Sequence, residues 1–193
     1  TGGTGGVTIK NSSFNNNYGA VSWAGLRILT NGAVLLDNIS TDENSGYGAY
    51  ITVNSPSTAS VTVNKSTFTE NNGHNLFVTS QGNIIVNGIT ANGSYNGGGA
   101  YLDNQAGTGT VSVLATLRAN VFNENDTFGL YIASTNTVTV NKVTASNNDD
   151  TAGIYIDNYK GGLGAGNVTI NGAIATHNYR HGISISTNGM ATL

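Results

Sequence analysis

The sequence predicts an all-β protein: a right-handed parallel β-helix, or β-solenoid, of about seven rungs with three short strands per rung. Two short apolar motifs predict this class because they recur together at intervals of roughly 26 residues, within the range of solenoid repeats. The composition agrees, since 27 of the 193 residues are Gly and only one is Pro. Many short strands joined by tight turns are typical of such a chain.

The first motif is apolar-x-apolar, and its period of two indicates a strand with the apolar side chains facing inward. It begins at Val7, Val34, Val61, Ile84, Val111, Val138 and Val168. Further along each repeat we expect a third, shorter strand that contributes one more inward residue. These residues are Phe14, Ile39, Phe68, Ile89, Leu117, Val143 and Ile174.

The second motif is Gly-apolar-x-apolar, with Asn in place of Gly in one copy. It occupies residues 25–28, 48–51, 75–78, 99–102, 129–132, 153–156 and 182–185. A single rung buries little surface, and its backbone groups can pair only with the rungs above and below. We therefore expect residues 1–193 to form one array, uncapped at both ends, that is a segment of a longer repeat protein.

A column of asparagines lies ten residues after most starts of the first motif. Its members are Asn17, Asn44, Asn71, Asn148 and Asn178, while the fourth rung has Ser94 and an insertion brings Asn125 into the equivalent place. Asn tolerates a left-handed turn, and stacked amides can hydrogen-bond along a solenoid axis. The column predicts a structural ladder at a turn.

The outward residue of the second motif is aromatic in five consecutive rungs, between Arg27 and Ser184. These residues, which we call the aromatic stripe, are Tyr50, Phe77, Tyr101, Tyr131 and Tyr155. One interpretation is ring stacking that stabilises neighbouring rungs. The other is a platform for sugars or a lateral contact with another subunit, because exposed aromatic patches often mark ligand-binding or protein-interaction sites.

Asp103 and Asp157 each lie two residues beyond an aromatic of the stripe. Two rungs separate them, or about 9–10 Å, which is near the upper end for the carboxylates of inverting glycosidases. Acidic residues followed by Asn are also ordinary turn formers at strand ends. We favour the turn interpretation, so no catalytic residue is predicted and the two carboxylates remain weak candidates.

Composition excludes several classes of partner and cofactor. Charged residues make up 9% of the chain and the net charge is -3, so no basic patch for nucleic acid is expected. No apolar run approaches membrane-spanning length, so we expect no membrane insertion. The chain has no Cys, and the run Gly161–Gly166 resembles a calcium-binding repeat but has Gly166 where the liganding Asp should be. We expect neither a metal nor a cofactor.

Residues 167–171 (Asn-Val-Thr-Ile-Asn), followed by residues 178–185 (Asn-Tyr-Arg-His-Gly-Ile-Ser-Ile), resemble the generic β-helix repeats of bacterial surface proteins in the pectate-lyase-like superfamily. The resemblance implies the fold, which hosts lyases, hydrolases and adhesins alike. Arg180-His181-Gly182 is also similar to the Gly-His-Gly segment of polygalacturonases, with Arg180 replacing the first Gly. His74 falls in the same column as His181, and we interpret both as turn residues.

These patterns favour a structural or adhesive extracellular segment on a bacterial cell surface: a stalk, adhesin, sheath or filament subunit that is not an enzyme. The expected partners are further copies of the chain, end to end or laterally, and a polysaccharide. The alternative is a carbohydrate-binding or polysaccharide-degrading β-helix, a lyase or glycosidase, that uses the aromatic stripe.

Overall fold

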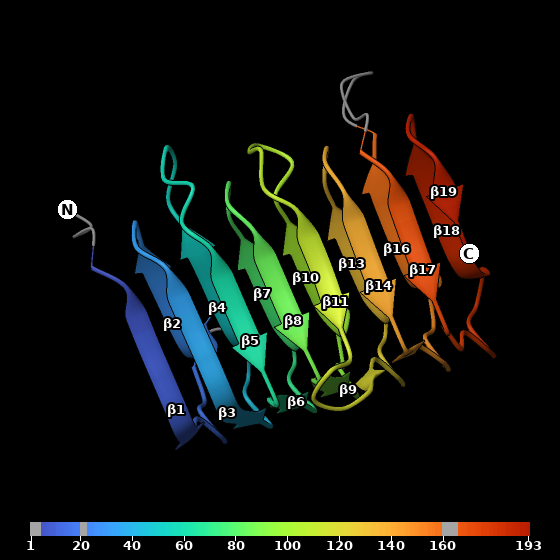
Figure 1. Ribbon diagram of the computed structural model, residues 1–193. Helices are drawn as coiled ribbons and strands as arrows, with labels where there is room; N and C mark the ends of the chain where they lie inside the picture. The colour runs from blue at the N-terminus through green and yellow to red at the C-terminus, as the bar shows by residue number, and fades with distance from the viewer. Residues whose placement is uncertain (1–4, 20–22, 160–165) are drawn as a thin grey trace.

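The computed structural model describes residues 5–19, 23–159 and 166–193. These residues form nineteen β-strands and no helix, and all strand pairs are parallel. The chain coils through successive rungs from the blue end to the red end of Figure 1, and each strand pairs with the equivalent strand of the next rung. The predicted class, an all-β parallel β-solenoid, is confirmed.

Each complete rung contributes to three faces. The first face contains the first motif: β1 (Val7–Ser13), β3 (Val34–Asp42), β5 (Val61–Asn64), β8 (Ile84–Asn87), β11 (Val111–Leu114), β14 (Val138–Asn141), β17 (Val168–Asn171) and β19 (Ala191–Thr192). The short face contains β6 (Thr67–Thr69), β9 (Thr90–Asn92), β12 (Asn120–Val121), β15 (Val143–Thr144) and the second halves of β1 and β3. The third face contains the second motif: β2 (Ala24–Thr30), β4 (Tyr47–Val53), β7 (Leu76–Thr79), β10 (Ala100–Asp103), β13 (Leu130–Ala133), β16 (Ala152–Asn158) and β18 (His181–Thr187).

Alternation of period two decides which side chains enter the core. In β5 and β7 the burial pattern is buried, half-buried, buried, half-buried, as the apolar-x-apolar motifs predict. Leu76, Leu102 and Ile132 on the third face and Ile84 on the first face are fully buried. The core is therefore a continuous column of stacked aliphatic side chains, to which every rung contributes.

The predicted third inward position is wrong in two rungs. Leu117 is 47% exposed and Ile174 is 56% exposed. Leu117 lies in the connection between β11 and β12, which is longer than in the other rungs, and Phe122 enters the core after it. Ile174 bridges Thr144 in the outward register, and Ala173 packs against the core instead.

Two corners with left-handed backbone bound the short face. The first corner includes Asn38, Lys65, Gly88, Lys142 and Gly172, and the second includes Asn16, Glu43, Glu70, Gly93, Glu124, Asn147 and His177, all with positive φ. The asparagine column was predicted at the left-handed turn, but the left-handed residue is the one before it. Glu70, for example, has φ 52° and directly precedes Asn71. Each asparagine is thereby turned toward the inside of its corner.

Candidate functional site

The asparagines of the second corner form a hydrogen-bonded ladder along the solenoid. The Nδ2 of Asn44 donates to the Oδ1 of Asn71 at 2.8 Å, and the backbone N–H of Asn44 donates to the same oxygen at 3.1 Å. Asn17 donates to Asn44 in the same way, and Asn148 to Asn178. Most of these amides also donate to a backbone carbonyl of the preceding rung, as Asn44 does to Phe14, so the ladder satisfies its own polar groups.

The ladder stays continuous where the sequence column breaks. Ser94 is too short to reach, and Asn75 takes its place: it accepts from the Nδ2 of Asn71 at 2.7 Å and donates to the Oδ1 of Asn125 at 3.1 Å. Asn75 is the residue that replaces Gly in the second motif. Asn125 then donates to the Oδ1 of Asn148 at 3.0 Å, so the ladder runs from Asn17 to Asn178.

The glycine of the second motif exists to make room for this ladder. A Cβ at Gly129 would lie 2.6 Å from the backbone oxygens of Gly153 and Phe122, and 2.9 Å from the Nδ2 of Asn148. A Cβ at Gly48 would meet the amide of Asn71 at 2.6 Å. No side chain fits at such distances unless it replaces the ladder amide itself, which is what Asn75 does.

The aromatic stripe is a stack of parallel rings on the third face. The ring centroids of Tyr50, Phe77 and Tyr101 are 4.9 Å apart at each step, with interplanar angles of 5°. Tyr131 and Tyr155 continue the stack at 4.9 and 5.0 Å, with angles of 14°. At the first end, the guanidinium carbon of Arg27 lies 5.9 Å from the Tyr50 ring centroid. All five rings are half-buried, so one edge of each ring faces solvent.

A second row of rings flanks the stripe and was not predicted as a site. Tyr47, His74 and Phe128 form this flanking row, each three residues before a member of the stripe. The His74 ring lies nearly parallel to those of Phe77 and Tyr101, at 6.0 and 5.9 Å, and 5.2 Å from Phe128. The constant offset of three residues was the available signal. Interpreting His74 as a plain turn residue missed these ring contacts.

His74 is neutral in this environment. Burial lowers the pKa of its imidazole to about 4 from an ordinary 6.5. Its Nδ1 accepts a hydrogen bond from the backbone N–H of Gly98 at 2.7 Å, which the neutral tautomer with the proton on Nε2 allows. A neutral ring that is held by the backbone packs like the neighbouring aromatics, and at neutral pH it contributes no positive charge.

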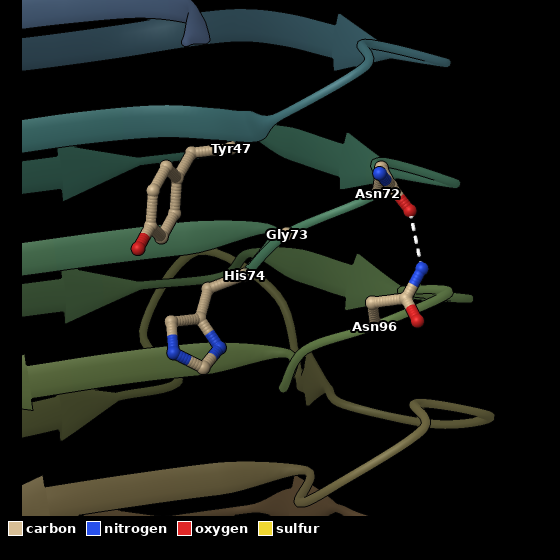
Figure 2. Close-up of a pocket in the computed structure, with 5 residues that line it drawn as sticks. All are labelled: Tyr47, Asn72, Gly73, His74 and Asn96. Atoms are coloured by element: carbon tan, nitrogen blue, oxygen red, sulfur yellow. Dashed lines mark hydrogen bonds between the residues drawn. The ribbon is translucent and has the colours of Figure 1, made fainter. Parts of the chain in front are cut away.

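Two surface hollows adjoin these rings. Figure 2 shows the first, of about 420 Å³, with the Tyr47 and His74 rings on one side of Gly73 and the amides of Asn72 and Asn96 on the other. The Nδ2 of Asn96 donates to the Oδ1 of Asn72. The second hollow, of about 710 Å³, is lined by Trp23, Arg27, Tyr47 and Tyr50, and the Trp23 side chain is 65% exposed. Rings beside amides or a guanidinium form the kind of mixed surface that can take up a polar ring such as a sugar.

Asp103 and Asp157 act as turn residues in the structure. The Oδ1 of Asp103 accepts from the N–H of Gln105 at 2.9 Å, and the Oδ1 of Asp157 accepts from the N–H of Tyr159 at 3.1 Å. The Gln105 side chain also reaches the Oδ2 of Asp157 at 3.3 Å. Ala133 lies between the two carboxylates in the register, so they occupy alternate rungs as expected.

The same carboxylates influence the tyrosines of the stripe. Burial, and to a smaller extent the negative charge of Asp157, raises the pKa of Tyr131 to about 12. Burial followed by Asp103 and Asp157 raises the pKa of Tyr101 in the same direction. Both hydroxyls are therefore protonated near neutral pH and available as hydrogen-bond donors at the edge of the stripe.

The remaining candidates from the sequence lie apart from these rings or outside the described residues. His181 is exposed at the start of β18, and Arg180 forms an ion pair with Asp150 at 3.7 Å. Residues 161–165 of the glycine run are outside the described part of the chain. Within that part, no group of three or more His, Asp or Glu side chains is placed to hold a metal ion, and no helix is long and apolar enough to span a membrane.

No protein-family model, curated protein or solved structure matches this chain.

Proposed function

We propose that this chain is a structural or adhesive β-solenoid of a bacterial surface, a stalk, sheath, adhesin or filament segment without a catalytic site. The observation that carries the proposal is that the candidate polar side chains hydrogen-bond to one another or to the backbone of the solenoid. The asparagines bond to one another, and Asp103 and Asp157 accept backbone N–H groups at turns. His74 likewise accepts from Gly98.

Catalysis needs acid, base and stabilising groups that converge on one reacting atom. Asp103 and Asp157 sit on alternate rungs of a flat face, and the imidazole of the flanking row, His74, is uncharged at neutral pH. The likeness of residues 178–185 to β-helix repeats of bacterial surface proteins in the pectate-lyase-like superfamily supports the surface location.

Incubation with a panel of plant, algal and bacterial polysaccharides tests the absence of catalysis. We expect no new reducing ends and no unsaturated products above a heat-denatured control. The Asp103→Asn and Asp157→Asn variants should match the wild-type chain. Turnover by the wild-type chain that either substitution abolishes would contradict the proposal and assign a lyase or glycosidase activity instead.

A second candidate function is carbohydrate binding along the aromatic stripe. Its support is the combination of five parallel, half-buried rings with a hollow lined by Trp23, Arg27 and Tyr47. Because the rings of the stripe cover one another's faces, a sugar would meet their edges and the tyrosine hydroxyls, while the exposed Trp23 ring offers a face for stacking. Apolar rings with a few polar groups are the usual design of a small-molecule site. The repeat of about 4.9 Å between rings is close to the length of one sugar unit, so an extended chain could contact several rungs at once.

A glycan array probed with the wild-type chain and with the Tyr101→Ala/Tyr131→Ala variant tests this function. We expect retention on a subset of glycans that falls at least tenfold in the variant. The matched control is Tyr95→Ala/Tyr179→Ala, which removes two exposed tyrosines outside the stripe. Equal retention of all three proteins, or none by the wild-type chain, would leave the stripe with a structural role only.

A further inference from the structure

The short face of the solenoid separates charges of opposite sign. Its outward side chains are small and uncharged over most of its length, for example Thr67, Thr69, Thr90, Val121 and Thr144. The two left-handed corners bound it on either side, five residues apart in each regular rung, as Lys65 and Glu70 are. At strand spacing this makes a strip about 16 Å wide.

One edge of this strip is basic. Four of the seven Lys and Arg residues of the chain lie at the first corner or beside it: Lys10, Lys65, Arg118 and Lys142. All four are exposed. The Arg118 guanidinium crosses from its loop to the carbonyl of Ser66 at 3.1 Å, so its charge lies against the strip. The opposing charge on this edge is Asp37, which pairs with Lys65 at 3.9 Å.

The other edge is acidic. Seven of the ten Asp and Glu residues of the chain lie at or near the second corner: Asp42, Glu43, Glu70, Glu124, Asp126, Asp149 and Asp150. All are exposed except Asp42, which is half-buried. Arg180 is the cationic residue that pairs with this edge, through Asp150 at 3.7 Å. The Tyr95 hydroxyl donates a hydrogen bond to the Oε2 of Glu70 at 3.4 Å. Glu43, Glu70 and Glu124 carry no ion pair among the described residues.

We propose that the short face pairs with the short face of a second copy, with the two solenoid axes parallel. A twofold axis that runs along the solenoid direction reverses the strip from side to side but leaves each rung opposite its equivalent. The basic edge of one copy then faces the acidic edge of the other, twice. A twofold axis across the strip would place like charges together, so charge complementarity selects the parallel arrangement.

The pairing sets a register. Lys65 of each copy faces Glu70 of the same rung in its partner, and Lys142 faces Asp149, which gives four ion pairs at the two edges. The Arg118 guanidinium lies over the rung of Ser66 and adds positive charge opposite Glu70. The side chains between the two edges are mostly small, and the exposed Leu117 and Ile174 are the large apolar side chains that a partner strip must pack around. Over seven rungs the strip is about 30 Å long, so the pair would bury roughly 1,000 Å² in total, which is the lower limit for a specific interface. We therefore expect weak, salt-sensitive association.

Sedimentation velocity of the 193-residue chain tests the pairing. At 0.05 M NaCl and protein concentrations above about 100 µM we expect a dimer, with the association constant reduced at least tenfold at 0.5 M NaCl. A monomer of 19.8 kDa under all these conditions would overturn the inference. If that monomer bound heparin, the basic edge would be assigned to a polyanion instead.

Charge reversal makes the test specific. The Glu70→Lys/Asp149→Lys variant carries Lys on both edges at these two rungs, and Lys65→Glu/Lys142→Glu carries acidic residues on both edges at the same two rungs. Each should be monomeric alone, whereas an equimolar mixture should dimerise, because their unlike edges then meet. Lys65, Glu70 and Lys142 have similar positive φ and exchange unbranched side chains, and Asp149 is exposed, so the corners should keep their conformation. Melting followed by circular dichroism checks this. If a charge-reversed variant has a lower melting temperature than the wild-type chain, the neutral variant Lys65→Gln/Lys142→Gln is used in its place.

Two results would contradict the pairing: dimerisation of both charge-reversed variants alone, or a mixture that remains monomeric. The Tyr101→Ala/Tyr131→Ala variant is the matched control and should dimerise like the wild-type chain. Since the aromatic stripe lies on the third face, the outcome does not depend on the proposed function. Glycan binding and catalysis would be judged by their own assays whether or not the copies pair.

Discussion

Asn75 donates its side-chain amide to the Oδ1 of Asn125 across fifty residues of sequence, and so bridges the rung in which Ser94 interrupts the asparagine ladder. The two departures from the repeat are thus linked. An Asn where the second motif requires Gly compensates for a Ser where the ladder requires Asn. Each is unfavourable alone, since a Cβ at the Gly position points at the amide of the next rung.

This compensation predicts a double-mutant cycle. Ser94→Asn places a second amide where that of Asn75 already lies, and Asn75→Gly leaves Asn71 and Asn125 without their partner. Each single substitution should lower the free energy of unfolding by about 2–3 kcal/mol, whereas the double variant should lie within about 1 kcal/mol of the wild-type chain. Urea denaturation followed by circular dichroism measures the coupling. Additive losses in the double variant would show that the two sites are independent.

The ladder itself should contribute strongly to stability. Asn148 is fully buried, accepts from Asn125 and donates to Asn178, so Asn148→Ala leaves several buried groups without partners. We expect a loss of about 3 kcal/mol in the free energy of unfolding. The control Asn171→Ala removes an exposed amide that donates to Asn141 and should cost less than about 0.5 kcal/mol. Similar losses in both variants would refute a special role for the buried column.

Replacing a glycine of the second motif by alanine should lower the stability of the fold. Gly129→Ala puts a Cβ at 2.6 Å from two backbone oxygens, so neighbouring rungs must separate. The expected loss is about 3 kcal/mol or more, by the mechanism of an overpacked core. Gly5→Ala is the matched control, because no atom lies within 4 Å of its Cβ position. Thermal melting of the two variants should therefore diverge, and equal melting temperatures would contradict this explanation of the motif.

The His74 side chain should make stability fall in acid. Its folded pKa of about 4 lies below the ordinary value of 6.5, so the unfolded chain binds the proton first as the pH drops. Stability is therefore unaffected by this group above about pH 6.5. It declines between about pH 6.5 and 4, by less than about 3 kcal/mol, because the ring is half-buried and partly hydrated.

Urea denaturation across this pH range compares the wild-type chain with His74→Phe, which keeps a ring in the flanking row. The wild-type loss should exceed that of the variant, because other titrating groups are common to both. Titration of the His74 ring protons by NMR measures the pKa directly. A midpoint near 6.5 would show that the ring is more hydrated than its position indicates.

The periodicity of two predicted the first and third faces because their inward positions are apolar in nearly every rung. It failed at Leu117 because the extra residues before β12 shift the register, a shift that alternation does not show but that the displaced Asn125 of the same rung indicated. The spacing of ten residues located five ladder asparagines but not Asn75, which lies in the glycine column. The flanking row had a readable signal, since Tyr47, His74 and Phe128 share one offset from the stripe. That His74 packs as a neutral ring depends on burial, which only the assembled rungs create.

The ladder amides all point the same way. From Asn17 to Asn44 and from Asn148 to Asn178, each Nδ2 donates toward the C-terminal rung, and each Oδ1 faces the N-terminal one. Their dipoles therefore add head to tail instead of cancelling, and each hydrogen bond polarises the next. The solenoid acquires an electrical polarity along its axis, with the positive end toward the C-terminal rungs. Copies with parallel axes would place these dipoles side by side in the same sense, and the dipoles would then repel each other weakly. The attraction between the basic and acidic edges must exceed this repulsion.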